Sequence, residues 1–284
     1  MADTITAGAM QALSLRRRER WAQTPQTRTP TPEAAIPLIE RLGVVTLYPL
    51  SPELPDLLHA YVGNDTERAV LPSWDSPMGD VYTWRWTLGR QSAAFYSAFL
   101  RGRPTWVSWA LLPAVLRLRG ELRTPDELYD ARVISADAYR IAHVLDEASE
   151  PLPTGELRQR AGFPTGKPQR AAYLRAIAEL ETRLLLAKVF PADGEGENMH
   201  HALVANLYRQ HIQQAEQLTR EAAFDALLAS YLPNAVYAVP KVLARQFGLP
   251  EAELRAALDR QVASGNAKPV TLPEQVGVCY LWIE

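Results

Sequence analysis

The 284-residue sequence has a single cysteine, Cys279, and only four lysines among its 30 basic residues. One cysteine excludes an internal disulfide and any metal site built from several cysteines. The longest apolar run, around Trp106 to Val115, is too short to span a bilayer and ends in arginines. The N-terminus also lacks the basic-then-apolar order of a signal peptide. These absences predict a soluble cytoplasmic protein without a membrane partner.

Sequence signatures of several enzyme classes are missing as well. The chain has no His-Glu-x-x-His, no Gly-x-Ser-x-Gly, no P-loop and no Gly-x-Gly-x-x-Gly. His200 and His201 are adjacent, and neighbouring residues on a strand face opposite sides, so the two do not converge on one ligand. The sequence therefore predicts no metal site and no nucleotide cofactor.

What the chain does contain is arginine close to tryptophan. Five of the seven tryptophans lie between Trp74 and Trp109, and seven arginines but a single acid, Glu121, lie between residues 85 and 123. A second basic window covers residues 157–190, although the net charge of the whole chain is only -2. Because arginine pairs with phosphate and aromatic rings stack on bases, the local charge favours a nucleic-acid partner. The alternative is a tryptophan-rich core beneath a solvated arginine surface.

Three stretches share one order of helix, short helix, longer helix and strand. In the clearest of them, Ser135 precedes apolar residues that repeat from Ala138 to Leu145 at the spacing of an amphipathic helix. A second helix ends at Gly162, Pro168 opens a third, and a hairpin pattern follows. This order is typical of the winged helix, whose third helix enters the major groove of DNA. The predicted fold is therefore mainly helical, with tandem winged-helix units.

Between the first and second of these stretches, residues 90–119 are predicted as a pair of helices broken at Gly102. The same pattern divides the chain into four parts. The parts are a first winged-helix-like unit at 1–62, a Trp/Arg-rich helical segment at 63–133, a second winged helix at 134–210 and a third at 211–284.

Candidate DNA contacts are basic residues in the windows and on the first helix, together with one tryptophan. On the helix from Pro168, the arginines are predicted to face outward while Tyr173 and Ile177 face inward. Four tryptophans (84, 86, 106 and 109) are predicted to lie in the core. For each arginine, the alternative to a DNA contact is a place on a solvated helix face. The predicted contacts are Arg16, Arg17, Arg85, Arg101, Arg103, Arg158, Lys167, Arg170, Arg175 and Trp74.

Three short motifs occur in a fixed order ahead of the tandem units: Ile39-Glu-Arg-Leu-Gly-Val-Val45, Val70-Leu-Pro-Ser-Trp74 and Arg101-Gly-Arg-Pro104. This ordered set resembles the AlkZ/YcaQ family of bacterial DNA glycosylases. Members of that family are built from tandem winged helices and a β-barrel, and they excise alkylated or crosslinked purines. The resemblance implies a DNA-binding scaffold and a duplex DNA partner, although the chain ends at its last hairpin with little room for the barrel.

The chain departs from the family at the catalytic motif. The resemblance implies Gln-x-Gln or Gln-x-Asp after the strand that follows the first helical unit, where this sequence has Thr46-Leu47-Tyr48. Hydrolysis of an N-glycosidic bond needs a group that orients water and stabilises positive charge on the sugar. Threonine and tyrosine supply no negative charge at neutral pH. The catalytic candidates are Thr46, Tyr48 and Asp75, with Asp80 nearby; for Asp75 a turn-forming role is the alternative.

Taken together, these patterns predict a nucleoid-associated protein that binds damaged or distorted double-stranded DNA in DNA repair. One alternative is an active alkylpurine DNA glycosylase that uses non-standard residues. Two others are a winged-helix transcriptional regulator and a protein-interaction scaffold.

Overall fold

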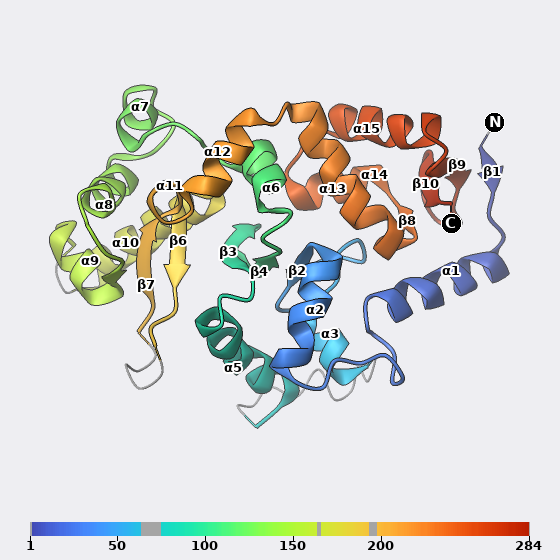
Figure 1. Cartoon of the computed structure of the whole chain (residues 1–284), viewed down its shortest axis with the longest axis horizontal. Coiled ribbons are helices and arrows are strands. Elements are labelled where there is room, and N and C mark those ends of the chain that lie inside the picture. Colours follow the sequence, from blue (N-terminus) through green and yellow to red (C-terminus); the bar gives the residue numbers. More distant parts are fainter. Residues whose placement is uncertain (1, 64–74, 164–165, 193–197, 284) are drawn as a thin grey trace.

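Three small sheets, each flanked by helices, organise the residues described by the computed structural model, which are 2–63, 75–163, 166–192 and 198–283 (Figure 1). The molecule is mainly helical, as predicted. An order of helix, strand, two helices and two strands occurs three times along this part of the chain. In each sheet the third strand of the set lies between the other two, giving β2-β4-β3, β5-β7-β6 and β8-β10-β9.

The first repeat runs from α2 to β4 and is preceded by a strand and a long helix. Helices α1 and α2 lie on either side of a proline-containing loop, and a strand follows α2. The repeat continues past residue 62, where the sequence pattern suggested a boundary. The elements are β1 (Asp3–Thr4), α1 (Ala7–Arg20), α2 (Pro32–Leu42), β2 (Val44–Thr46), α3 (Leu57–Val62), α5 (Pro77–Arg90), β3 (Phe95–Leu100) and β4 (Arg103–Val107).

The helical pair predicted over residues 90–119 is wrong in its first half, because β3 and β4 form an antiparallel hairpin there. The turn between them has positive φ values at Arg101 (53°) and Gly102 (72°), the conformation of a tight hairpin turn. Gly102 thus makes a strand turn and not a helix break. The segment Phe95–Leu100 is buried on both faces, so it lacks the alternation that identifies a strand in a sequence.

The second repeat is the one that the sequence pattern described best. Its three helices and both strands of its hairpin are confirmed, although the return strand ends at Leu203. Ahead of this repeat, Thr124 and Glu127 form a capping box at the start of a short helix. The elements from here to the third repeat are α6 (Leu112–Arg119), α7 (Pro125–Asp130), α8 (Ala136–Asp146), β5 (Leu152–Pro153), α9 (Thr154–Arg160), α10 (Lys167–Thr182), β6 (Leu186–Val189), β7 (His200–Leu203), α11 (Val204–Leu207) and α12 (Arg209–Gln217).

The third repeat also follows its predicted order, and its sheet gains a strand from the other end of the chain. Residues of β1 pair in parallel with β9, and Lys268 Nζ lies 3.0 Å from Asp3 Oδ2. The two ends of the chain therefore lie side by side (Figure 1). The elements are α13 (Arg220–Ala235), β8 (Tyr237–Ala238), α14 (Pro240–Phe247), α15 (Glu251–Ala263), β9 (Ala267–Thr271) and β10 (Cys279–Trp282).

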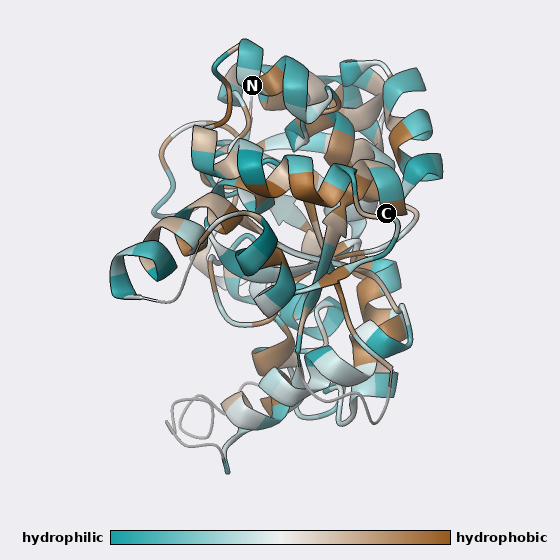
Figure 2. Cartoon of the chain, turned by 90° about the vertical axis from the view of Figure 1, so that its left-hand side faces the viewer, coloured by the Kyte–Doolittle hydropathy of each residue, from teal (hydrophilic) through white to brown (hydrophobic). Residues whose placement is uncertain are grey.

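Most buried apolar side chains belong to two cores. The helices have apolar residues on one side and polar residues on the other, as the hydropathy colours in Figure 2 indicate. The larger core joins the first and third repeats and includes Leu184, Ala187 and Val204 near the hairpin of the second repeat. The helices of the second repeat have a core of their own. Trp84, Trp86 and Trp106 are buried as predicted, whereas Trp109 is half-buried and its indole N–H donates to the carbonyl of Ser92 at 2.7 Å. Among the described residues, no helix is long and apolar enough to cross a bilayer.

Candidate functional site

The first basic window contains arginines in two kinds of surroundings. Arg101 and Arg103 are exposed on either side of the turn between β3 and β4. Arg85 is half-buried on α5, and its guanidinium carbon lies 3.6 Å from the centre of the Tyr82 ring. Because this contact holds the guanidinium against a neighbouring side chain, Arg85 packs on the protein surface. Besides the two hairpin arginines, Arg123 is exposed in this window, but it lies 2.8 Å from Glu121.

The second basic window places its cations on the outer side of α10. Lys167, Arg170 and Arg175 are exposed, whereas the predicted inward-facing residues of the helix are buried. Arg158, on α9, is half-buried. This helix therefore presents three positive charges to solvent from one repeat.

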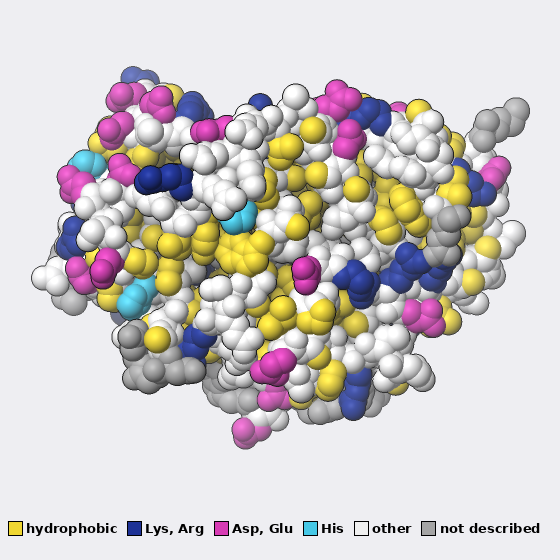
Figure 3. Space-filling model, viewed as in Figure 1, with side chains coloured by type: hydrophobic (Ala, Val, Ile, Leu, Met, Phe, Trp, Pro, Cys, Tyr) yellow, Lys and Arg dark blue, Asp and Glu magenta, His cyan; other side chains and the backbone are white. Residues whose placement is uncertain are grey.

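The face shown in Figure 3 carries basic and acidic side chains interspersed, with apolar side chains gathered across its middle. Several arginines of the windows pair with acids: Arg183 lies 3.6 Å from Glu121, and Arg160 lies 3.5 Å from Glu156. The local excess of arginine in the sequence is therefore partly neutralised on the folded surface. Within the two windows, the exposed cations without an acidic partner among the described residues are Lys167, Arg170 and Arg175 of α10 and Arg101 and Arg103 of the β3–β4 turn.

Arg16, Arg17 and Arg18 lie in different surroundings, because adjacent residues on a helix point about 100° apart. Arg16 and Arg18 are half-buried, and Arg17 is buried. The Arg17 Nε donates to the carbonyl of Ala235 at 2.6 Å, and its Nη1 lies 2.9 Å from Glu53 Oε1. This burial contradicts the predicted DNA contact of Arg17, which instead fastens α1 to the third repeat.

The carboxylate of Glu53 is the centre of that buried network. Besides Arg17, it accepts a hydrogen bond from the hydroxyl of Tyr231 at 2.6 Å and one from the backbone N–H of Val239 at 3.1 Å. Burial, with Glu53 alongside, raises the pKa of Tyr231 well above its usual value, so this hydroxyl stays a donor. The network joins α1, the segment 49–56 and α13, and its charges are satisfied within the fold.

The residues at the place of the expected catalytic motif are not presented to a substrate. Thr46 is fully buried in β2, and its hydroxyl donates to the carbonyl of Pro55 at 3.2 Å. Tyr48 is half-buried and donates to the carbonyl of Met78 at 3.1 Å, and burial raises its pKa. Because the Thr46 hydroxyl is enclosed and bonded, the structure contradicts a catalytic role for it. Tyr48 has its hydroxyl committed to the backbone.

The aspartates beside the tryptophan motif lie at the start of α5. Asp75 is exposed next to Ser76, and it is Ser76 that caps the helix by accepting from the N–H of Gly79 at 3.4 Å. Asp80 is exposed and accepts from the hydroxyl of Tyr61 at 2.9 Å. Trp74, the predicted stacking residue, lies outside the described residues.

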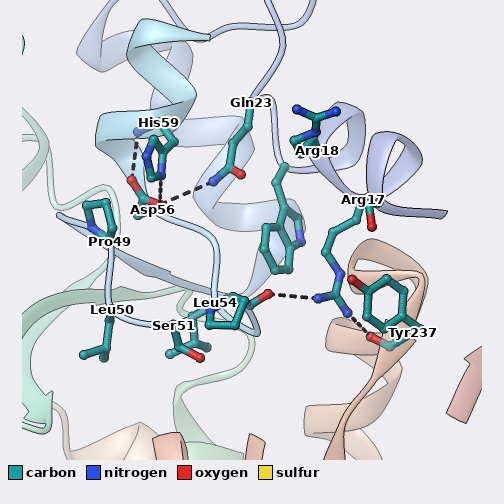
Figure 4. Close-up of a pocket in the computed structure, with 13 residues that line it drawn as sticks. Arg17, Arg18, Gln23, Pro49, Leu50, Ser51, Leu54, Asp56, His59 and Tyr237 are labelled. Atoms are coloured by element: carbon teal, nitrogen blue, oxygen red, sulfur yellow. Dashed lines mark hydrogen bonds and ion pairs between the residues drawn. The ribbon is translucent and has the colours of Figure 1, made fainter. Parts of the chain in front are cut away.

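A different place has the shape of a binding site. A cavity of about 510 Å³ opens between α1, the segment 49–56, the start of α3 and β8 (Figure 4). Its apolar walls come from one tryptophan and two leucines, and the remaining side chains are mostly polar. The lining residues are Ser14, Arg17, Arg18, Trp21, Gln23, Pro49, Leu50, Ser51, Pro52, Leu54, Asp56, His59 and Tyr237.

One side of this cavity carries a hydrogen-bonded set of an amide, a carboxylate and an imidazole. Asp56 precedes α3 and accepts from the backbone N–H of His59 at 2.8 Å, which fixes its carboxylate as the helix cap. Its Oδ2 lies 2.8 Å from His59 Nδ1 and 3.4 Å from Gln23 Nε2 (Figure 4). The hydrogen bond to Asp56 outweighs burial and raises the pKa of His59. The contact with Asp56 therefore favours the protonated form of the ring.

Sequence reasoning did not identify Gln23, Asp56 or His59. The spacing Asp56-x-x-His59 is the one signal that was available, since it is that of a helix cap whose third residue reaches back. Gln23 gives no such signal, because it reaches Asp56 from 33 positions away. Within the described ranges, no group of three or more His, Cys, Asp or Glu side chains is placed to hold a metal ion.

Comparisons with known proteins point to one family. A family model described as AlkZ related matches residues 29–248 of this chain. The solved structure of the DNA glycosylase AlkZ from Streptomyces sahachiroi is similar to this chain with a TM-score of 0.57 at 14% identity, over 99% of this chain and 70% of that one. At this identity the likeness establishes a shared fold. A comparison with curated proteins gives no match.

Proposed function

The chain belongs to the AlkZ-related family, and from this premise we propose that it is a DNA-repair protein of the glycosylase type that binds double-stranded DNA. The observation that carries the proposal is the likeness of fold to a DNA glycosylase over 99% of the chain. Its target is damaged or distorted duplex DNA, met in the cytoplasm at the nucleoid. This proposal needs no nucleotide cofactor.

In this proposal each repeat is a winged helix, with units at 32–107, 136–203 and 220–282. The support is the recurrence of one element order and one strand order in the three sheets. This division moves the first boundary from 62 to 107. A winged helix places its third helix in the major groove, and the third helices here are α5, α10 and α15.

The helix α10 is the proposed DNA-reading element, because Lys167, Arg170 and Arg175 are exposed on it. Arginines at such positions pair with phosphates or with guanine. On α15, by contrast, Arg255 lies 2.8 Å from Glu251 and its charge is neutralised within the helix. The proposed phosphate contacts outside α10 are Arg16, Arg101, Arg103 and Arg158, with Trp74 as the proposed stacking residue.

The test is the affinity for a duplex oligonucleotide of the wild type and of the double variant Arg170→Ala/Arg175→Ala. We expect the double variant to bind more weakly by roughly 1–3 kcal/mol per base contact that is lost. A matched control, Arg28→Ala/Arg209→Ala, removes the same charge from exposed positions outside both windows and leaves affinity nearly unchanged. Equal weakening by both double variants would show that only net charge matters.

The same oligonucleotides separate repair from gene regulation. A repair protein binds duplexes with a lesion or an abasic site more tightly than undamaged duplexes of the same sequence. A transcriptional regulator discriminates instead between undamaged sequences, typically by about 1–3 kcal/mol for each mismatched base pair. Footprinting on a random and on a selected duplex distinguishes the two.

A further inference from the structure

The polar side chains on one side of the cavity between α1 and α3 have their hydrogen-bond partners within the protein. We call this the satisfied side and the opposite one the open side. On the satisfied side, Arg17 is paired with Glu53, and its remaining donors go to backbone carbonyls. On the open side are Arg18, Gln23 and His59 (Figure 4). The Nε of Arg18 is buried and has no hydrogen-bond partner among the described residues. On the open side, therefore, the Gln23 amide nitrogen is already bonded to Asp56, whereas the Arg18 guanidinium has a donor that the fold leaves unused.

The size and lining of the cavity suit a flat, polar ligand with a negative charge. Its volume of about 510 Å³ is within the usual range of small-ligand cavities, about 300–1,000 Å³. Trp21 and Leu54 give apolar walls, against which a planar ring packs favourably. Gln23 offers an amide for base edges, and Arg18 offers a guanidinium for phosphate. A nucleotide that has left the duplex stack has this combination of groups.

The Asp56–His59 pair gives the cavity a proton donor at a defined atom. Asp56 holds His59 Nδ1 at 2.8 Å, so the ring is fixed in orientation and Nε2 is the nitrogen that remains for exchange with a ligand. A carboxylate that orients an imidazole and stabilises its protonated form is a recurring arrangement in acid–base catalysis. The His59 side chain is 29% exposed, compared with 4% for Asp56, so the imidazole is the accessible member of the pair.

We propose that this cavity receives one extruded nucleotide of damaged DNA and that the His59 imidazolium, held by Asp56, protonates the base as its bond to C1′ breaks. This inference rests on the proposed function and names the substrate-handling residues of the same protein. Trp21 and Leu54 pack against the base, Gln23 contacts its edge, and Arg18 binds its phosphate.

The proposed step is a hydrolysis that balances without any further reactant. The electron pair of the bond between C1′ and the base nitrogen goes to the base, which takes the proton from His59 Nε2. Water then adds its oxygen to the positively charged C1′ and gives its proton to Nε2, which restores the imidazolium. The products are the free base and an abasic site. Asp56 keeps its contact with His59 Nδ1 throughout and stabilises the positive ring.

The charged and titratable groups around His59 set the pH range of this step. Asp56 contacts the ring through Nδ1, and Arg17 and Arg18 of α1 are the other charged residues that line the cavity. Glu53 neutralises Arg17, and Asp80 lies on the neighbouring helix α5. Because the hydrogen bond to Asp56 raises the pKa of His59, the acid form persists to a higher pH than in a free histidine. Base release should therefore slow as the pH rises through that raised value.

The experiment measures single-turnover base release from duplexes that contain one hypoxanthine or one N7-methylguanine, read as strand cleavage at the abasic site. Hypoxanthine leaves as an anion unless it is protonated, whereas N7-methylguanine is cationic and leaves as a neutral base. We expect His59→Gln to slow hypoxanthine release by about 100-fold or more, with N7-methylguanine much less affected. The pH dependence seen in the wild type should vanish in this variant.

Two further variants separate catalysis from folding. Asp56→Asn keeps the size of the side chain and removes the charge, and it should slow hypoxanthine release in the same selective way. His143→Gln changes an exposed histidine on α8 and should leave both rates unchanged. The melting temperature and duplex affinity of each variant are measured alongside, which identifies a misfolded variant. If either His59→Gln or Asp56→Asn misfolds, the base-release rates of the other variant test the proposal.

The outcomes distinguish this inference from the proposed function. If the wild type binds duplex DNA but releases neither base, or if His59→Gln and wild type release hypoxanthine at the same rate, the inference is overturned while DNA binding stands. If the wild type does not bind duplex DNA at all, the proposed function itself fails. Selective loss of hypoxanthine release with unchanged duplex affinity supports both.

Discussion

Arginine side chains are buried in one region of the molecule and exposed in another. The first region is the junction where α1 meets the segment 49–56 and the third repeat, and the second is the second repeat. At the junction, Arg17 is 4% exposed and donates to the carbonyls of Ala235 and Pro52 and to the Glu53 carboxylate. In the second repeat, Arg170 and Arg175 are exposed on α10. The acceptors of Arg17 include a carbonyl 218 positions away in the sequence. An arginine is therefore available for a ligand only where the fold does not place an internal acceptor beside it.

Removing Arg17 should give the largest effect on stability. In Arg17→Ala, the Glu53 carboxylate stays buried without its cation, and breaking a buried pair in this way costs about 3–5 kcal/mol. Arg170→Ala should change the free energy of unfolding by less than about 0.5 kcal/mol, because that side chain is exposed. Urea unfolding of the two variants measures the difference.

A second variant checks the cause. Arg17→Ala combined with Glu53→Gln removes the unpaired charge and should recover part of the lost stability. If Arg17→Ala is no more destabilising than Arg170→Ala, the buried network does not hold α1 in place and the contrast between the two regions is lost.

Acidification should weaken the second repeat through His201. Burial, with Lys188 and His200 adding to it, lowers the pKa of His201 to about 3. Below the ordinary value of about 6.5, the unfolded chain therefore binds a proton that the folded chain does not, and stability falls as the pH falls. The loss should be roughly 2 kcal/mol between about pH 6.5 and pH 5.

The measurement is urea unfolding of wild type and His201→Gln over that pH range. Glutamine can keep the contact with the Thr154 hydroxyl, which lies 3.0 Å from His201 Nε2, but it does not titrate. A pH dependence that persists unchanged in His201→Gln would assign it to other groups.

The pH dependence of stability that His59 causes should be opposite in sign to that of His201 and smaller. Its pKa is raised by the hydrogen bond to Asp56, so its stabilising effect is fully present below about pH 6.5 and is lost as the pH rises through the folded value. Because the ring is partly exposed to solvent, the effect should be at most about 1 kcal/mol. A titration of the ring by NMR gives the sign directly, and a folded pKa below that of a free histidine would contradict it.

Much of the fold could be predicted where the pattern is local. The apolar spacing from Ala138 to Leu145 predicts α8, and Gly162 predicts the end of α9. The hairpin of β3 and β4 could not be predicted in this way. Phe95–Leu100 is buried on both faces and has the composition of a core helix as much as of a strand.

The candidate site was less predictable, because its parts meet only in three dimensions. Arg16, Arg17 and Arg18 look alike in the sequence, and tertiary contacts alone decide which of them is buried. Likewise Asp56 gains its amide contact from Gln23 on a distant segment. The residues that did follow the sequence pattern are those on α10, where helix periodicity sets exposure without help from long-range contacts.

The salt dependence of duplex DNA binding tests the central claim most directly. Each phosphate contact adds about 0.9 to the slope of log affinity against log salt concentration, because a bound counterion is released. If Arg170 and Arg175 contact DNA, the slope for Arg170→Ala/Arg175→Ala should be shallower than that of the wild type by about 1–2. Identical slopes and affinities for the two proteins would contradict the claim that α10 is the DNA-binding element.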